Sequence, residues 1–271
     1  MKLSSSHKKV VVVIPLYKEE PSADDIISIK QCVSVLHNHL IAVVKPIGLS
    51  LHKYPFAFPL IESFDSHYFS SIHGYNKLML SSEFYQRFLD FHYILIHQTD
   101  AFVFSDQLDY WCGLNYDYIG APWLYRDYID IVKYSKERLK GFFSRKFNLK
   151  QKGSQLPIDL QFHNVVGNGG FSLRNVNKFY QICIKKQKII SKYLAKKEKQ
   201  FNEDVLFSIE MNRYKTRIRT PHYKKALLFA IESYPVLAFK LIENQLPFGC
   251  HGWDKQRDFW SPIFLKYGIK I

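Results

Sequence analysis

Apolar runs typical of buried strands alternate along this chain with stretches in which apolar residues recur at helical spacing. Residues 9–17 (KVVVVIPLY) form a continuous β-branched run closed by Pro15, which is typical of a central parallel strand. Ser22, with Asp25 three residues later, resembles a capping box, and helically spaced apolar residues follow it. The chain is therefore expected to begin with a strand that leads into a helix.

The same alternation continues through the first half of the chain. Residues 40–44 and 60–64 are expected as strands, and residues 74–91 as one helix or two short ones. Residues 93–104 (YILIHQTDAFVF) form an apolar run that is interrupted by three polar residues, Gln98 to Asp100. This order predicts a single α/β domain with a mostly parallel, doubly wound sheet flanked by helices. Ligands bind at the carboxyl edge of such a sheet, where Asp100 is expected.

A long polar segment divides the second half of the chain. Residues 116–123 are expected as a strand that ends in a turn, whereas residues 125–162 are lysine-rich and are expected as a mobile loop. Residues 164–174 (NVVGNGGFSLR) place three glycines beside a strand end. The elements expected after it are a helix over 179–194 with a lysine face, a helix that starts at 202–204, and a short strand at 217–219.

Length and composition limit the class of protein. At 271 residues, of which 47% are hydrophobic, the chain can bury one large core. The four cysteines lie far apart without a CxxC pair, which argues against a zinc site or a disulfide framework and favours a reducing compartment. The first nine residues are polar, so no signal peptide is expected, and no apolar stretch reaches the roughly 18 residues of a membrane span.

The net charge of +14 requires an anionic partner or a solvated surface. Nucleic acid, an anionic membrane and a phosphorylated substrate are the three candidates. Most of the 22 Phe and 18 Tyr residues lie within apolar runs, where packing in the core is their expected role. No RNP-like, helix-turn-helix or zinc-finger pattern is present, so binding to nucleic acid is not expected.

Four groups of polar or glycine residues fall at the ends of the predicted elements. Taken singly, each has a purely structural interpretation: an acidic pair starts a helix, glycines make a tight turn, and a histidine lies in a loop. Their order along the chain is more informative than any one of them. The groups are residues 17–20, residues 98–100, residues 167–170 together with 202–204, and His251.

In this order the chain resembles the GT-A class of nucleotide-sugar glycosyltransferases, from Val10 to about Trp253. It is similar, more closely, to a bacterial family of uncharacterised glycosyltransferase-like domains in four segments: HQTDAFVF, YDYIGAPW, VGNGGFSLR and NEDV. The resemblance implies a GT-A-like, Rossmann-like fold in a single domain over residues 1–271. Its implied parts are a nucleotide-binding part at 8–124, the mobile loop at 125–162, and an acceptor-binding and C-terminal part at 163–271.

The resemblance also implies a nucleotide-sugar site with a divalent cation, Mn²⁺ or Mg²⁺. In the Asp-x-Asp motif of the class, the first acidic residue often helps to hold the ribose and the second commonly contacts the metal. Gln98 replaces the first one here, so Asp100 and His251 are the implied metal ligands. The residues implied for binding the nucleotide sugar are Pro15, Tyr17, Glu19, Lys77, Gln98, Thr99 and Asp100.

The acidic pair of the class implies the catalytic base. Asp204 is the first candidate and Glu203 the second, because the pair faces the acceptor and an inverting transfer needs a group that removes the proton of the acceptor hydroxyl. A retaining transfer would change that role. The residues implied for binding the acceptor are Trp123, Gly169, Gly170 and Phe171, although Trp123 and Phe171 are equally compatible with the core.

The expected function is transfer of a sugar from a nucleotide sugar, by default a UDP-hexose, to a hydroxyl group. The expected acceptor is a bacterial surface glycan of the lipopolysaccharide, capsule or O-antigen type, at the cytoplasmic face of the membrane. The lysine face over 185–199 is compatible with contact with anionic lipids or with simple solvation. The alternatives are a non-catalytic module that binds glycan or nucleotide, motivated by Gln98, and a basic nucleic-acid-binding protein.

Overall fold

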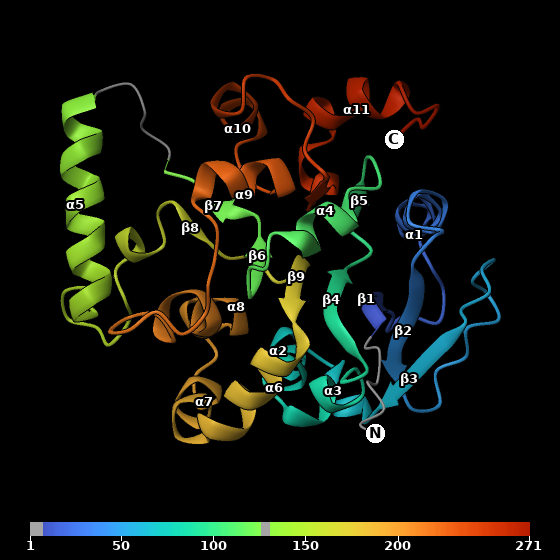
Figure 1. Cartoon of the computed structure of the whole chain (residues 1–271), viewed down its shortest axis with the longest axis horizontal. Coiled ribbons are helices and arrows are strands. Elements are labelled where there is room, and N and C mark those ends of the chain that lie inside the picture. Colours follow the sequence, from blue (N-terminus) through green and yellow to red (C-terminus); the bar gives the residue numbers. More distant parts are fainter. Residues whose placement is uncertain (1–7, 126–130) are drawn as a thin grey trace, which may run out of the picture.

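The computed structural model describes residues 8–125 and 131–271, which fold around a six-stranded sheet (Figure 1). The strand order is β3-β2-β1-β4-β9-β6; β3, β2, β1 and β4 are parallel, and β9 runs antiparallel to both β4 and β6. The predicted mostly parallel α/β domain is confirmed. The strands of this sheet are β1 (Lys8–Pro15), β2 (Leu40–Pro46), β3 (Leu60–Phe64), β4 (Phe91–His97), β6 (Tyr118–Gly120) and β9 (Phe171–Asn175).

Strand β1 is apolar from Val10 to Pro15 because helices cover both faces of the sheet. Val11 and Val13 belong to the hydrophobic cluster on one face, and Val12 and Ile14 to the cluster on the other. The first face carries α2 (Ile72–Met79), α3 (Ser82–Gln86), α6 (Val176–Lys185) and α7 (Gln187–Leu194). The second carries α1 (Ala23–Val35), α4 (Leu108–Gly113) and α9 (Tyr223–Phe229).

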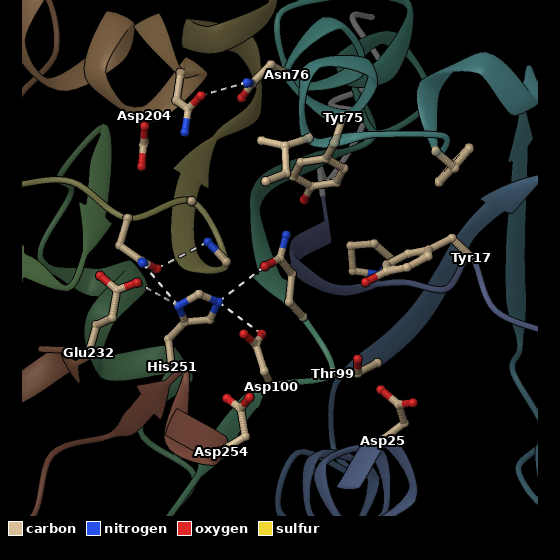
Figure 2. Close-up of a pocket in the computed structure, with 18 of the residues that line it drawn as sticks. Tyr17, Asp25, Tyr75, Asn76, Thr99, Asp100, Asp204, Glu232, His251 and Asp254 are labelled. Atoms are coloured by element: carbon tan, nitrogen blue, oxygen red, sulfur yellow. Dashed lines mark hydrogen bonds and ion pairs between the residues drawn. The ribbon is translucent and has the colours of Figure 1, made fainter. Parts of the chain in front are cut away.

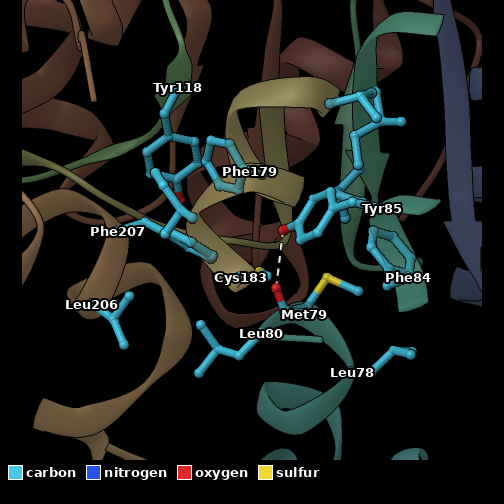
Figure 3. Close-up of a cluster of buried hydrophobic side chains, with 14 of the residues drawn as sticks. Leu78, Met79, Leu80, Phe84, Tyr85, Tyr118, Phe179, Cys183, Leu206 and Phe207 are labelled. Carbon is cyan, nitrogen blue, oxygen red and sulfur yellow. Dashed lines mark hydrogen bonds between the residues drawn. The ribbon is translucent and has the colours of Figure 1, made fainter. Parts of the chain in front are cut away.

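The cluster on the first face is rich in aromatic side chains (Figure 3). Phe84 and Tyr85 of α3 pack at right angles to each other, and Tyr85 continues onto Phe179 of α6. The Tyr85 hydroxyl donates to the carbonyl of Met79, 3.0 Å away, so its one polar atom is satisfied inside the cluster. These contacts fix α2 and α3 against α6, and α2 in turn borders the cavity described below.

A smaller sheet joins the C-terminal part of the chain to the end of β4. Its order is β10-β11-β5, formed by β10 (Ala230–Ile231), β11 (Gly249–His251) and β5 (Ala101–Val103). Strand β11 runs antiparallel to β5 and places His251 opposite Ala101. A third hydrophobic cluster holds this sheet against α10 (Pro235–Leu241) and α11 (Arg257–Leu265).

The remaining elements are short or peripheral. They are β7 (Pro122–Trp123) paired with β8 (Val165–Val166), α5 (Ile131–Phe147), α8 (Glu203–Val205), the π-helical turn η4 (Leu206–Glu210), and the 3-10 turns η1 (Ser66–Tyr68), η2 (Asp159–Gln161), η3 (Lys199–Phe201) and η5 (Trp253–Gln256). Within the described ranges, no helix has the length and apolar character needed to cross a bilayer.

Three predictions of secondary structure are corrected. Residues 125–162 were expected as a loop, yet they contain the 17-residue helix α5 and the turn η2; residues 126–130 of that loop lie outside the described residues. Helix α5 escaped detection because apolar side chains such as Phe142 and Phe147 remain exposed instead of marking a buried stripe. The mobility of this segment stays a prediction.

The other two corrections concern shorter elements. The helix expected over 179–194 is divided into α6 and α7, because the backbone at Lys186 leaves the helical conformation. Residues 217–219 form no strand. The side chain of Asn212 accepts from the backbone N–H groups of Arg217 and Ile218, and this local bond takes the place of a sheet ladder.

Candidate active site

A cavity of about 820 Å³ opens where β1 and β4 end at the carboxyl edge of the sheet (Figure 2). This is the edge at which the sequence places Asp100, so the structure confirms where the polar groups gather. The predicted site residues that line the cavity are Pro15, Tyr17, Gln98, Thr99, Asp100, Gly169, Gly170, Glu203, Asp204 and His251.

Two strand registers bring the centre of this cavity together. The antiparallel pairing of β5 with β11 sets His251 opposite Ala101, and therefore next to Asp100. The pairing of β4 with β9 continues past His97, where the backbone N–H of Gln98 donates to the carbonyl of Gly170 at 2.8 Å. Residues that are about 70 and 150 positions apart in the sequence thus meet because of sheet pairing.

His251 is held between two carboxylates. Its Nε2 lies 3.0 Å from Oδ1 of Asp100, and its Nδ1 lies 3.2 Å from Oε1 of Glu232. Burial alone would lower the pKa of His251, but hydrogen bonds to Asp100 and Glu232 and the charges of both raise it to about 10. Burial acts to raise the pKa of Asp100, yet the hydrogen bond and charge of His251 leave it below its ordinary value. Without a cation the two side chains therefore form an ion pair at neutral pH, and a cation bound at Nε2 would take the place of the proton on that nitrogen.

The donor atoms at this point fit a divalent cation that is also held by phosphate. Among the described residues, no group of three or more His, Cys, Asp and Glu is arranged to hold a metal ion. Three donor groups converge on one point: the Asp100 carboxylate, Nε2 of His251 and Oε1 of Gln98. Oε1 of Gln98 lies 3.2 Å from Nε2 of His251. Glu232 contacts Nδ1 of His251 and so leaves Nε2 to face the cation. Histidines that bind metals commonly have a carboxylate on the other ring nitrogen in this way. Three ligands of this kind leave room for diphosphate oxygens around Mg²⁺ or Mn²⁺.

Gly170 leaves the space in which these ligands converge. A Cβ atom at this position would lie 2.0 Å from Nε2 of His251 and 2.5 Å from Oε1 of Gln98. The preceding turn is shaped by Asn168, which has a positive φ of 59° and accepts with Oδ1 from the N–H groups of Gly170 and Phe171. The absence of a Cβ atom at Gly170 thus allows the backbone to lie close to the ligand groups.

Gly170→Ala is therefore expected to weaken binding of a nucleoside diphosphate with Mn²⁺ by at least about tenfold, since the methyl group fills the space between the donor atoms. Calorimetric titration would measure this. Gly113→Ala is the matched control, because a Cβ there meets no atom within 4 Å. Equal affinity of both variants and the wild type would contradict a cation site at this position.

The acidic pair Glu203 and Asp204 has two different environments. Glu203 is buried, and its Oε1 accepts from the Arg174 guanidinium at 3.0 Å. Asp204 faces the cavity, and burial together with the charge of Glu203 raises its pKa to about 7. The start of α8 is held in place by Asn76, whose side chain accepts from the Glu203 N–H and donates to the Asn202 side chain. Both carboxylates line the cavity, and Asp204 is the more exposed of the two.

Arg174 stabilises this arrangement from inside the first-face cluster. Its side chain is fully buried and also donates to Ser172, Tyr85 and the carbonyl of Gly169. Arg174→Met is expected to lower the free energy of unfolding by about 3–5 kcal/mol, because Glu203 is left as an unpaired buried charge. Urea unfolding would measure it.

A second substitution separates the unpaired charge from lost packing. Adding Glu203→Leu to Arg174→Met is expected to recover most of the loss, since replacing both partners removes the stranded carboxylate. Arg87→Met is the control: Arg87 pairs with Glu62 at the surface, where such pairs contribute less than about 1 kcal/mol. A double variant as unstable as the single one would show that the pair itself is unimportant.

Four predicted site residues are placed outside this cavity. Phe171 is fully buried against Phe229 and Phe248, because it points to the opposite side of the strand from Gly170. Lys77 follows Asn76 on α2 and is not among the residues that line the cavity, and Glu19 is exposed in the loop after β1. The burial of Phe171 corrects its prediction as an acceptor contact, and the nucleotide-binding roles of Lys77 and Glu19 stay predictions. Trp123 lines an adjoining cavity instead.

Glu232 is a site residue that the sequence did not indicate. It lies in the turn after β10, and its contact with His251 depends on the pairing of β10 with β11. Asp25 was predicted only as a helix cap, and it also lines the cavity, where it accepts from Lys18 and Ser22. No local motif marks either residue as part of a ligand site.

Comparison with known proteins places this geometry in a family. The family described as "Protein of unknown function (DUF5672)" matches residues 60–251, which is more than half of the chain. The chain belongs to the DUF5672 family. The matched range includes Gln98, Asp100, Asp204 and Glu232 and ends at His251. No curated protein matches the chain.

Solved structures establish the fold of this DUF5672 member. The galactosyltransferase LgtC, solved with donor and acceptor sugar analogues, is 14% identical over 89% of this chain and 86% of its own, with a TM-score of 0.52. Core-mannan synthase A (CmsA/Ktr4) from Aspergillus fumigatus, in its Mn/GDP form, is 10% identical over 83% of this chain and 75% of its own, with a TM-score of 0.53. The expected GT-A fold is therefore confirmed.

Proposed function

We propose that this protein is a glycosyltransferase that takes a sugar from a nucleotide-sugar donor. The observation that carries the proposal is the meeting of Asp100, His251 and Gln98 in the same cavity as the carboxylate of Asp204. A site for a diphosphate with its cation and a candidate base thus share one space at the carboxyl edge of a GT-A sheet. The LgtC and CmsA structures, with donor analogue and with Mn/GDP, support this choice of ligand.

The donor is proposed to lie across the ends of β1 and β4. Pro15 and Tyr17 line the cavity. Tyr17 lies beyond Thr99 from Asp100 and presents an exposed ring on which a nucleobase can stack (Figure 2). Gln98 offers its amide to a ribose hydroxyl. A bound Mn²⁺ or Mg²⁺, held by Asp100 and His251, would neutralise the charge of the leaving diphosphate.

Asp204 is proposed to act on the acceptor. In a transfer with inversion, the acceptor oxygen forms a bond to the anomeric carbon, and the bond from that carbon to the phosphate oxygen breaks with its electron pair. The proton of the acceptor hydroxyl passes to the Asp204 carboxylate. A pKa of about 7 suits this role, because the group is largely ionised at slightly alkaline pH yet basic enough to accept a proton.

The finer assignment follows the motif resemblance. We propose a UDP-hexose as donor and a hydroxyl of a bacterial surface glycan, such as lipopolysaccharide, capsule or O-antigen, as acceptor at the cytoplasmic face of the membrane. The exposed lysines between 185 and 199 support peripheral contact with anionic lipid, at about 1 kcal/mol for each basic residue near the surface. Sedimentation with phosphatidylglycerol vesicles would test the contact, and unchanged binding after these lysines are replaced by glutamine would count against it.

The proposed function is tested by titrating the protein with UDP and GDP, each with and without Mn²⁺, and by measuring hydrolysis of a panel of nucleotide sugars. Binding that strengthens with Mn²⁺, together with release of the nucleoside diphosphate, is the expected result. Absence of binding and turnover across the panel would reject the proposal.

A non-catalytic module that binds glycan or nucleotide is the second candidate. It is favoured by Gln98, which stands where the class usually has a carboxylate. This alternative predicts nucleotide binding without turnover, and binding that is unchanged in Asp204→Asn. If the wild type turns over the nucleotide sugar and Asp204→Asn does not, the protein is an enzyme and not a non-catalytic module.

A further inference from the structure

A second cavity, of about 440 Å³, adjoins the first. Four residues line both cavities: Asn168, Asn202, Asp204 and Glu232. The two spaces therefore meet at the Asp204 carboxylate, and the second one extends away from the donor side, toward Trp123 and the start of α10. Its volume lies within the range of about 300–1,000 Å³ that is usual for pockets of small ligands.

An indole ring forms one wall of this second cavity. Trp123 packs against Gly167, where an added Cβ would lie 2.2 Å from the ring, and makes an edge contact with Phe162. The half-buried ring also lines the cavity, so its position is fixed by the protein on one side while it remains in reach of a ligand.

Tyr234 lies in the same cavity on a strained backbone. It adopts a left-handed conformation with φ of 51°, although it is a bulky residue and precedes Pro235. Such a conformation costs about 1–3 kcal/mol, and strain of this kind gathers at functional sites. The short connection that contains Tyr234 also contains Glu232, which contacts His251. One turn thus joins the cation side of the site to the second cavity.

Carboxyl side chains outnumber lysines among the described residues that line the second cavity. The lining contains Asp159, Asp204 and Glu232, of which Glu232 is paired with His251, and it contains Lys199. Carboxylates and amides bind hydroxyl groups, and aromatic faces bind the apolar face of a sugar ring. An anionic sugar next to Asp204 would be repelled.

We propose that the second cavity binds the end of a neutral saccharide acceptor, with a sugar ring against Trp123 and Tyr234 and a hydroxyl group directed at Asp204. This inference rests on the proposed function. To the acceptor role that the motif resemblance implies for Trp123, it adds the class of acceptor and a role for Tyr234. Tyr234 acts in specificity, because it contacts the acceptor and not the donor.

Calorimetry on the protein saturated with Mn²⁺ and with UDP or GDP tests the inference. The probes are octyl β-glucoside, octyl β-galactoside, octyl N-acetyl-β-glucosaminide and octyl β-glucuronide. Tyr234→Asn removes the ring but suits the left-handed backbone, so the variant is expected to fold. Tyr234→Phe keeps the ring, and Val236→Ala changes a side chain that is 72% exposed on α10, the helix that follows Tyr234.

The expected result is that at least one neutral glycoside binds more tightly than the glucuronide, and that Tyr234→Asn weakens this binding about fivefold or more. Tyr234→Phe and Val236→Ala stay within about twofold of the wild type, and the affinity for the nucleotide is unchanged in all variants. Nucleotide binding without binding of any neutral glycoside would overturn the inference alone, as would tighter binding of the glucuronide or an unchanged Tyr234→Asn. Absence of nucleotide binding in the wild type would instead reject the proposed function.

Discussion

Asp100→Ala is expected to reduce Mn²⁺-dependent turnover of the nucleotide sugar by about 10³-fold, which corresponds to roughly 4 kcal/mol of transition-state stabilisation. The large effect follows from the donor set, because Asp100 is the only carboxylate of the Asp-x-Asp segment that remains beside His251. Initial rates over a range of Mn²⁺ concentrations would measure the effect. The affinity for Mn²⁺ in the presence of nucleotide is expected to fall with the rate.

Asp109→Ala is a suitable control for this experiment. Asp109 is exposed and pairs with Lys9 at the surface, so its removal deletes a carboxylate without touching the cavity. Its turnover is expected to match that of the wild type. Full turnover of Asp100→Ala would show that the cation, if one binds, is held elsewhere, and would remove the main support for the proposed donor site.

Asp204→Asn is expected to reduce transfer by about 10²–10⁴-fold, which is the usual contribution of a positioned general base. The amide keeps the shape of the side chain but cannot accept the proton. In the wild type, kcat/KM is expected to rise about tenfold per pH unit below 7 and to level off above it, because burial and Glu203 raise the pKa of Asp204 to about 7. The variant is expected to lose this limb of the profile.

The same substitution is expected to affect stability in the opposite direction. Because the pKa of Asp204 is higher in the folded state than its ordinary value of 3.8, the folded protein binds the extra proton, and stability is lost as the pH rises from about 4 to 7. Asn removes this penalty, so Asp204→Asn is expected to be more stable than the wild type at pH 8, with little difference below pH 4. Thermal unfolding at both pH values checks the sign; an equally stable, fully active variant would contradict both roles.

The sequence predicted those parts of the structure that depend on local patterns. The run at β1 and the box formed by Ser22 and Asp25 gave correct elements, since strand burial and helix capping involve neighbouring residues. Asp100 and His251 were correctly expected to lie together. That expectation came from the order of the motifs, which resembles that of the GT-A class. The sequence contains no local pattern that predicts the pairing of β5 with β11.

What the sequence missed depends on tertiary register. Glu232 reaches His251 only through the pairing of β10 with β11, and Phe171 faces the core because alternate residues of a strand point to opposite sides. Tyr234 is a further case, since a left-handed tyrosine before a proline contradicts local preference. The strained backbone at Tyr234 lies in the proposed acceptor site, where function can impose strain.

The strand order has a consequence for how this chain can be divided. The segment that matches the family begins at residue 60, with β3, whereas β1 and β2 precede it and lie between β3 and β4 in the sheet. A fragment of residues 60–251 would therefore leave β3 without β2, the strand with which it pairs in the described residues, and would leave β4 with one bare edge. Exposed strand edges of this kind pair with other chains. The natural unit for expression and dissection is set by hydrogen-bonded neighbours in the sheet and not by the limits of sequence similarity.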